Sequence, residues 1–337
     1  MTTSASTEGL DSRQSRGLGR LLLDRPELMI LVALLIMIVV FATMRPDAFL
    51  SAINIRNMAM EAGMMMFLAT GMTYVIVTAG IDLSVGAVLV FSGVCSVLVM
   101  RLIGVDSPLA PWIGLVVAVL AGVAWGALNG VLIARANLSP LIVTLATMGI
   151  ALGASRLLVG GVDITGVPSS LVNTIGVGRI WGIPVIFLLS LAFAGLMGIV
   201  LHRTRFGLHT FAVGSNPQGA ERAGIDVARH LTRIYMISGL CAGIAGYLTL
   251  SRFASTTIAG HAMDNLKAIT AVVLGGASLF GGSGTLVGTG IGVLIPVVLA
   301  SGLVIVGLPS FWQEVAVGIV LLAAVMIDQW RRTRRSR

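Results

Sequence analysis

The chain has 337 residues, of which 56% are hydrophobic and only 11% are charged, and its mean hydropathy is +0.99. A soluble domain usually has about a quarter of its residues charged, so most of this surface is expected to face lipid. The net charge is +8, but the basic residues lie between and beyond apolar stretches, without the clustered basic face and interleaved aromatic residues of a nucleic-acid-binding protein. The composition predicts an integral membrane protein and excludes nucleic acid as a partner.

Ten apolar stretches are close to the length of about 20 residues that a membrane helix requires. In chain order they are residues 28–44, 58–79, 83–104, 110–133, 138–158, 183–201, 232–251, 265–281, 284–306 and 312–328. We therefore predict an all-α polytopic fold with about ten transmembrane helices and no second domain.

The segments that flank these stretches complete the predicted organisation. Residues 1–27 form a polar tail, residues 28–328 the transmembrane domain, and residues 329–337 a basic tail. The first apolar stretch is followed by Met44, Arg45 and Pro46 and not by a small-residue cleavage site, so we expect a retained helix and not a secretory signal.

The distribution of basic residues predicts the orientation in the membrane. If the N-terminus is cytoplasmic, the segments that alternate to the same side hold about two thirds of the 22 lysines and arginines, and both tails are basic. Cytoplasmic segments carry an excess of such residues. The pattern favours an even number of helices and two cytoplasmic termini.

The eighth and ninth stretches contain many glycines, which leaves residues 265–304 open to two interpretations. Two full spans would fit, and so would a pair of short re-entrant helices. Glycines at this density usually indicate close helix packing or a bend, and we expect packing here. No glycine run leads into Gly-Lys-Ser or Gly-Lys-Thr, so the sequence contains no P-loop and is not expected to hydrolyse ATP.

The longest predicted cytoplasmic loop, residues 202–230, combines apolar and charged residues. It begins with a basic turn at residues 204–207, and Asn216 is placed to cap a short helix over residues 218–223. Pro217 would occupy the first position of that helix and Gly224 would follow its end. A capped helix between two spans is typical of a docking element, although an ordinary solvated linker is the alternative.

Asp82 lies between the second and third spans, in a turn that contains two glycines. Its carboxylate could accept hydrogen bonds from the first free amides of the third helix and complement the positive end of that helix. An ion or proton site is the alternative, because acidic residues near the membrane are costly and often functional. No second acid lies nearby in the sequence to pair with Asp82, which favours the cap.

Six polar residues inside the predicted spans could line a path for a polar solute. They are Glu61, Thr70, Thr73, Asn129, Thr144 and Thr147. Threonine in membrane helices more often bonds to its own backbone, so most of these residues could be structural. Glu61 is the most costly to bury and therefore the most informative, unless it lies at the outer boundary in contact with water.

Four short motifs occur in a recognisable order along the chain. They are GIDLSVG at residues 80–86, TLAT at 144–147 after Ser-Pro, the FG…AVGSNP…AGI loop at 206–225, and AITAVVLGGASLFGG at 268–282. Together they resemble the permease subunits of bacterial ABC importers of simple sugars, the ribose-type permeases. The resemblance runs from about the first span to the last, and one departure is Thr270, where this family more usually has alanine.

This resemblance implies a permease with the type II ABC-importer fold in the bacterial cytoplasmic (inner) membrane. The implied partners are a second permease, identical or paralogous, two ABC ATPase subunits or one fused double ATPase, and a periplasmic or lipid-anchored solute-binding protein that delivers a sugar. No cofactor and no metal is implied. The family's coupling element to the ATPases falls on Gly214, Asn216, Pro217, Ala220, Ala223, Gly224 and Ile225.

Two other classes of protein compete with an importer permease. An ion-coupled secondary transporter needs acids or histidines within the membrane, and beyond Asp82 and Glu61 the predicted spans offer almost none. A membrane enzyme needs clustered His, Asp, Glu or Cys at ligand or triad spacing, which the sequence lacks. The importer permease is the favoured hypothesis, and the ion-coupled transporter is the alternative.

Overall fold

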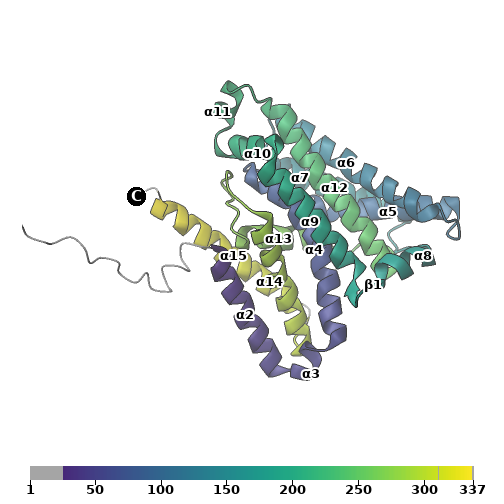
Figure 1. Ribbon diagram of the computed structural model, residues 1–337. Coiled ribbons are helices and arrows are strands. Elements are labelled where there is room, and N and C mark those ends of the chain that lie inside the picture. The colour runs from purple at the N-terminus through teal and green to yellow at the C-terminus, as the bar shows by residue number, and fades with distance from the viewer. Residues whose placement is uncertain (1–25, 310, 336–337) are drawn as a thin grey trace, which may run out of the picture.

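The computed structural model describes residues 26–309 and 311–335, and most of them belong to helices (Figure 1). The predicted polar tail lies outside the described residues as far as residue 25. The helices are α2 (Pro26–Met44), α3 (Pro46–Phe49), α4 (Ala52–Val77), α5 (Val85–Ile103), α6 (Ala110–Ala134), α7 (Pro140–Val159), α8 (Ser169–Leu171), a π-helical turn (Val172–Gly176), α9 (Val185–Arg203), α10 (Arg205–Ser215), α11 (Pro217–Arg222), α12 (Val227–Phe253), α13 (Asp264–Leu274), α14 (Leu286–Ile305) and α15 (Phe311–Arg335).

One small hairpin departs from the all-α prediction. Strand β1 (Arg179–Ile180) pairs antiparallel with β2 (Ile183–Pro184). The two residues between them, Trp181 and Gly182, both have positive φ, as a tight two-residue hairpin turn requires.

Seven helices of the described chain are long and apolar enough to cross a membrane, by length and composition: α4, α5, α6, α7, α9, α12 and α14. They correspond to the second to seventh and the ninth predicted stretches. Leu28–Met44 within α2 and Phe311–Met326 within α15 are apolar but shorter. The helix α15 continues to Arg335, so it includes most of the segment predicted as a basic tail.

The region of residues 265–304, for which two interpretations were open, contains one short and one long helix. Helix α13 has only 11 residues, and a glycine-rich loop, residues 275–285, connects it to the 20-residue α14. The predicted close packing is confirmed for this pair. A Cβ on Gly288 would overlap the carbonyl oxygen of Gly275, and one on Gly292 would overlap that of Ala271.

The centre of the bundle consists of α4 and α12. In α4 and α12, 89% and 78% of the 18-residue apolar stretch is buried inside the protein. The corresponding share is 28% in α7 and in α9, which lie at the periphery. Glycines bring α6 against α12, because Gly122 contacts the backbone at Gly239 and Gly243 too closely to admit a Cβ. Tyr74 of α4 donates a hydrogen bond to the carbonyl of Met197 on α9 at 2.6 Å.

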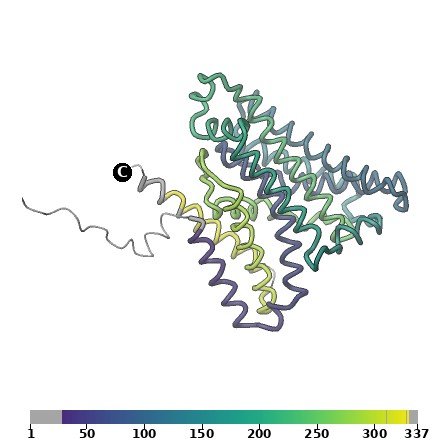
Figure 2. The backbone as a smooth tube through the Cα atoms, in the orientation of Figure 1, coloured from purple at the N-terminus to yellow at the C-terminus, as the bar shows by residue number. Residues whose placement is uncertain are grey.

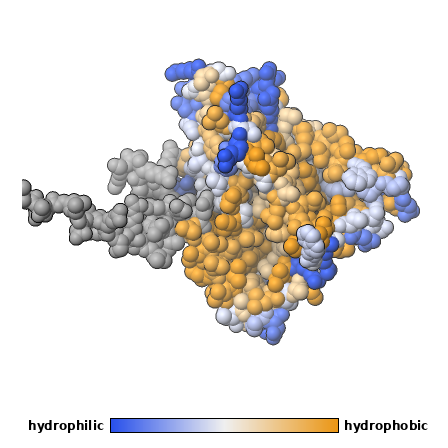
Figure 3. All heavy atoms as spheres, viewed as in Figure 1, coloured by the Kyte–Doolittle hydropathy of each residue, from blue (hydrophilic) through white to orange (hydrophobic). Residues whose placement is uncertain are grey.

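Polar residues gather at the ends of this bundle. The backbone tube in Figure 2 shows α10 and α11 together at one end of the long helices. In Figure 3 the visible face is largely apolar along the helices, and hydrophilic residues cover the end that contains α10 and α11. This distribution suits a bundle whose sides face lipid and whose ends face water.

Candidate functional site

The segment between α9 and α12 contains two short helices that stand at one end of the bundle. Asn216 accepts a hydrogen bond from the Gly219 amide at 2.9 Å and caps α11, and Pro217 is the first residue of that helix. Gly224 follows with φ of 84°, and the Ile225 amide donates to the Ala220 carbonyl at 3.1 Å. The predicted capped helix is confirmed.

The helix α10 was not predicted. Residues 204–207, interpreted as a basic turn, are instead the beginning of an 11-residue helix that Thr204 caps by accepting from the Gly207 amide at 3.4 Å. The local signal for this helix is Thr204, which directly precedes a stretch of mixed apolar and polar residues and is of a type that often caps a helix. The loop is consequently a pair of helices that meet at the extended residue Asn216.

The position of α10 is fixed by close contacts with three other parts of the bundle. Gly214 lies so near the carbonyl of Val77, at the end of α4, that no Cβ would fit there. The amide of Gly282, in the glycine-rich loop, donates to the same Val77 carbonyl at 2.9 Å. Thr210 is hydrogen-bonded to His230 of α12 at 3.0 Å. These contacts make α10 a rigid base for α11.

The predicted coupling residues divide into a buried group and an exposed group. Gly214 and Ala220 are buried and attach the two helices to the bundle. The exposed members lie on the surface at the tip of the segment, with Ile225 half-buried beside them: Asn216, Pro217, Ala223 and Gly224.

Asp82 occupies a buried turn before α5. Its Oδ1 accepts hydrogen bonds from the amide and hydroxyl of Ser84, at 3.0 and 2.6 Å, and its Oδ2 accepts from the hydroxyl of Ser238 on α12 at 2.7 Å. Ser84, and not Asp82, occupies the N-cap position of α5. Burial raises the pKa of Asp82, and these hydrogen bonds oppose the rise. Asp82 thus closes the turn and ties it to α12.

Three of the predicted path residues extend this buried network. The Asn129 amide donates to Ser84 at 2.8 Å, and the Thr147 hydroxyl donates to the Asn129 side-chain oxygen at 2.8 Å. Thr144 accepts from the Leu83 amide at 3.1 Å. The network therefore joins the turn before α5 to α6 and α7, and its polar groups satisfy one another.

The other two threonines of the predicted path are buried in α4. Thr73 lies 2.8 Å from Thr289 of α14, hydroxyl to hydroxyl, and also donates to the carbonyl of Ala69. The hydroxyl of Thr70 has no hydrogen-bond partner among the described residues.

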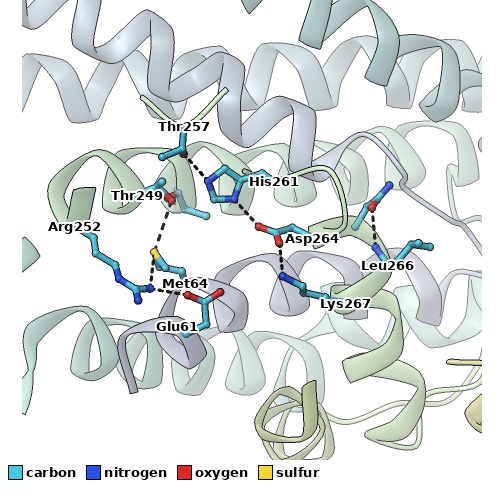
Figure 4. A network of polar contacts seen from close by, with 11 residues as sticks. Glu61, Met64, Thr249, Arg252, Thr257, His261, Asp264, Leu266 and Lys267 are labelled. Atoms are coloured by element: carbon cyan, nitrogen blue, oxygen red, sulfur yellow. Dashed lines mark hydrogen bonds and ion pairs between the residues drawn. The ribbon is translucent and has the colours of Figure 1, made fainter. Parts of the chain in front are cut away.

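Glu61 belongs to a different polar cluster, at the far end of α12 from α10 and α11 (Figure 4). Its Oε2 accepts a hydrogen bond from Arg252 Nη1 at 2.6 Å. In the same cluster Asp264 Oδ2 lies 2.6 Å from His261 Nδ1, and Asp264 Oδ1 lies 3.2 Å from Lys267 Nζ. Four segments contribute: α4, α12, the loop that follows α12, and α13.

A cavity of about 140 Å³ lies within this cluster. Its polar wall consists of Glu61, Thr249, Thr257, His261, Asp264 and Lys267. Met64 and Phe253 provide an apolar side. The five buried residues predicted for the path are not part of its lining, so Glu61 alone of the six lies at this cavity.

The charges of this cavity are paired. Asp264 lies between two basic side chains, with Oδ2 2.6 Å from His261 Nδ1 and Oδ1 3.2 Å from Lys267 Nζ. Glu61 has Arg252 as its partner at 2.6 Å. No group of three or more His, Cys, Asp or Glu side chains among the described residues is placed to hold a metal ion.

Most of this cavity cannot be predicted from the sequence, because its residues come from distant positions in the chain. Glu61 and Arg252 are separated by 191 residues. The signal that was present is a concentration of charge after the seventh span, where Arg252, His261, Asp264 and Lys267 occur within a chain that otherwise has few charges.

A bundle of long apolar helices with a helical pair at one end and a polar cavity toward the other fits a polytopic membrane permease. Residues 54–325 match the family described as the permease component of branched-chain amino acid transport systems, and the chain belongs to this family. Members of this family are translocation components and not enzymes.

The relatives in this family include several sugar permeases. The chain is 40% identical to the ribose import permease of Bacillus subtilis over 88% of its length and 91% of the relative. It is 36% identical to the D-allose transport system permease of Escherichia coli, over 88% and 89% of the two chains. It is 33% identical to the fructose import permease of Rhizobium meliloti, over 98% and 93%. The resemblance drawn from the four motifs is confirmed. No solved structure matches the chain significantly.

Proposed function

We propose that this chain is the transmembrane permease subunit of an ATP-driven importer for a monosaccharide or a similar small polyhydroxy solute. The similarity to permeases named for ribose, allose and fructose, over nearly the whole chain, carries this proposal. The absence of a P-loop from the sequence supports ATP hydrolysis on separate subunits.

The proposed arrangement in the bacterial cytoplasmic membrane has ten apolar helices and two cytoplasmic termini, as in type II importers. These helices are α2, α4, α5, α6, α7, α9, α12, α13, α14 and α15, of which α13 is too short to cross on its own. The excess of basic residues on one side supports this orientation. It places residues 1–27, 202–230 and 329–337 in the cytoplasm.

The proposed partners are a second permease, two ABC ATPases or one fused double ATPase, and a solute-binding protein. The exposed tip of α11, with Asn216, Pro217 and Gly224, would contact an ATPase, and Gly214 and Ala220 would transmit force to the bundle. The close contacts of α10 with α4 and the glycine-rich loop support this role, because a rigid connection transmits displacement and a flexible one does not.

The proposed solute path passes Glu61, which lies at the polar cavity. The buried residues of the predicted path would meet a solute only in a conformation in which the central helices separate. These residues are Thr70, Thr73, Asn129, Thr144 and Thr147.

Reconstitution of the complete importer tests this function. The chain would be purified with the ATPase and the solute-binding protein encoded beside it and placed in vesicles, and uptake of labelled D-ribose, D-allose, D-fructose and L-leucine would be measured. We expect uptake of at least one sugar that requires ATP. Uptake without ATP but with an ion gradient would favour the secondary transporter, and uptake of leucine alone would overturn the sugar assignment.

A further inference from the structure

We propose that the cavity between α4, α12 and α13 is a binding site for an uncharged polyhydroxy solute, so that the permease itself recognises the sugar during transfer. This inference rests on the proposed function and adds a location and a ligand class to it. Glu61, Thr257, His261, Asp264 and Lys267 would form hydrogen bonds with the hydroxyl groups.

The cavity lies where an arriving solute would enter. Helix α12 begins beside α10 and α11 and has 27 residues, a length of about 40 Å at the rise of an α-helix. Thr249 and Arg252 are in its last two turns, at the opposite end from the proposed ATPase contact. The Glu61 side chain is 38% exposed, so the cavity is not sealed inside the chain.

The size of the cavity indicates a small ligand. Its volume of about 140 Å³ is well below the roughly 300–1,000 Å³ of pockets that enclose drug-sized molecules. A monosaccharide is compatible with such a space once side chains adjust, whereas an oligosaccharide or a nucleotide is not. Met64 and Phe253 offer an apolar surface to the C–H groups of a sugar ring, opposite the polar wall.

The charges indicate an uncharged ligand. Glu61 is paired with Arg252, and Asp264 with Lys267, so each carboxylate in the cluster already has a cationic partner. A sugar phosphate or an amino acid brings its own charges, which need unpaired counter-charges to offset the cost of leaving water. Hydroxyl groups can instead donate to the carboxylates and accept from Lys267, and hydrogen bonds to charged groups are stronger than neutral ones.

A cysteine placed in the cavity tests occupancy directly. In the assembled importer without ATP, Thr257→Cys would be modified by a methanethiosulfonate reagent in the presence of D-ribose, D-allose, D-fructose, ribose 5-phosphate or L-leucine. At a concentration of about ten times its Kd, a bound sugar should slow modification about tenfold. Leu102→Cys, at an 86% exposed position at the same end of the bundle, should react at one rate in every solution.

A second substitution separates binding from a purely structural role. Adding Lys267→Met to Thr257→Cys should abolish protection by the sugar, whereas adding Arg156→Met, an exposed charge on α7, should leave it unchanged. If Lys267→Met lowers the melting temperature but protection persists, the ion pair is only structural and the proposal fails.

The outcomes distinguish this site from the function on which it rests. ATP-driven uptake of a sugar by the Thr257→Cys importer itself, without protection of that cysteine by the same sugar, would overturn the site and leave the importer intact. Protection by leucine or by ribose 5-phosphate, and not by a neutral sugar, would overturn the ligand class. Failure of the wild-type complex to take up any sugar would overturn the proposed function instead.

Discussion

Gly214 shows how a single missing side chain positions an external helix. It lies within α10 and has helical backbone geometry, so the reason for glycine is space and not φ. The carbonyl of Val77 and the amide of Gly282 occupy the volume that a Cβ would need. Gly224 in the same segment is glycine for a different reason: its φ is 84°, whereas a Cβ at this position would meet no atom within 4 Å.

Gly214→Ala should therefore displace α10 from the end of α4. Overpacking of a tight contact costs about 1–3 kcal/mol, and we expect a lower melting temperature and faster proteolysis within residues 202–230. Gly195→Ala is the matched control, because Gly195 is also helical but a Cβ there would meet no atom within 4 Å. That control should be neutral or stabilising by up to about 1 kcal/mol. Equal effects of the two substitutions would contradict the assigned contact.

Asp82→Asn tests the buried turn before α5. Asparagine keeps one oxygen acceptor for Ser84, but its amide cannot accept from the Ser238 hydroxyl. A buried group left without its partner costs about 1–3 kcal/mol, so the melting temperature should fall while the preference among solutes stays unchanged. In a Ser238→Ala background, Asp82→Asn should lower the melting temperature by less, because the hydroxyl that would lose its acceptor is already absent. Unaltered stability together with a new dependence on Na⁺ or H⁺ would instead indicate an ion site.

The helices that can be predicted from the sequence are those whose bounds depend on neighbouring residues in the chain. The long spans follow from uninterrupted hydrophobicity, and the α11 helix follows from Asn216 and Pro217 next to each other. The short length of α13 did not follow, because apolar residues continue past Leu274 and only the glycine-rich loop ends the helix. The polar cavity could not be predicted, since Glu61 meets Arg252 only through the packing of α4 on α12.

The helical pair α10–α11 is expected to bind the ATPase through its exposed tip. Gly224→Asp, or Asn216→Ala together with Pro217→Ala, should abolish co-purification of the ATPase, because loss of the cap and of the left-handed residue unfolds α11. Membrane insertion and yield should remain unchanged. Arg135→Ala, at an exposed position in the short connection between α6 and α7, is the control. Normal ATP-driven uptake by the α11 variants would refute the docking role.

One short helix, α13, connects the polar cavity with the contact region of α10. Helix α13 holds Asp264 and Lys267 of the cavity at its first turn, and the glycine-rich loop follows its last residue. In that loop Gly282 bonds to Val77, at the site where Gly214 of α10 is seated. The cavity lies on the side of the bundle where α12 ends, away from the proposed ATPase contact, and α13 with the glycine-rich loop connects the two by backbone contacts.

This arrangement requires the two regions to face opposite sides of the membrane, which cysteine labelling can measure. Glu221→Cys, exposed on α11, should react with a membrane-impermeant maleimide only after the cytoplasmic membrane is permeabilised. Leu102→Cys, 86% exposed at the far end of α5, should react in intact spheroplasts. The natural cysteines are a small background, because Cys241 is buried and Cys95 is half-buried. Labelling of Glu221→Cys from outside would show that the orientation is the reverse of the one proposed. The cavity would then face the cytoplasm and could not receive a solute delivered from outside the cell.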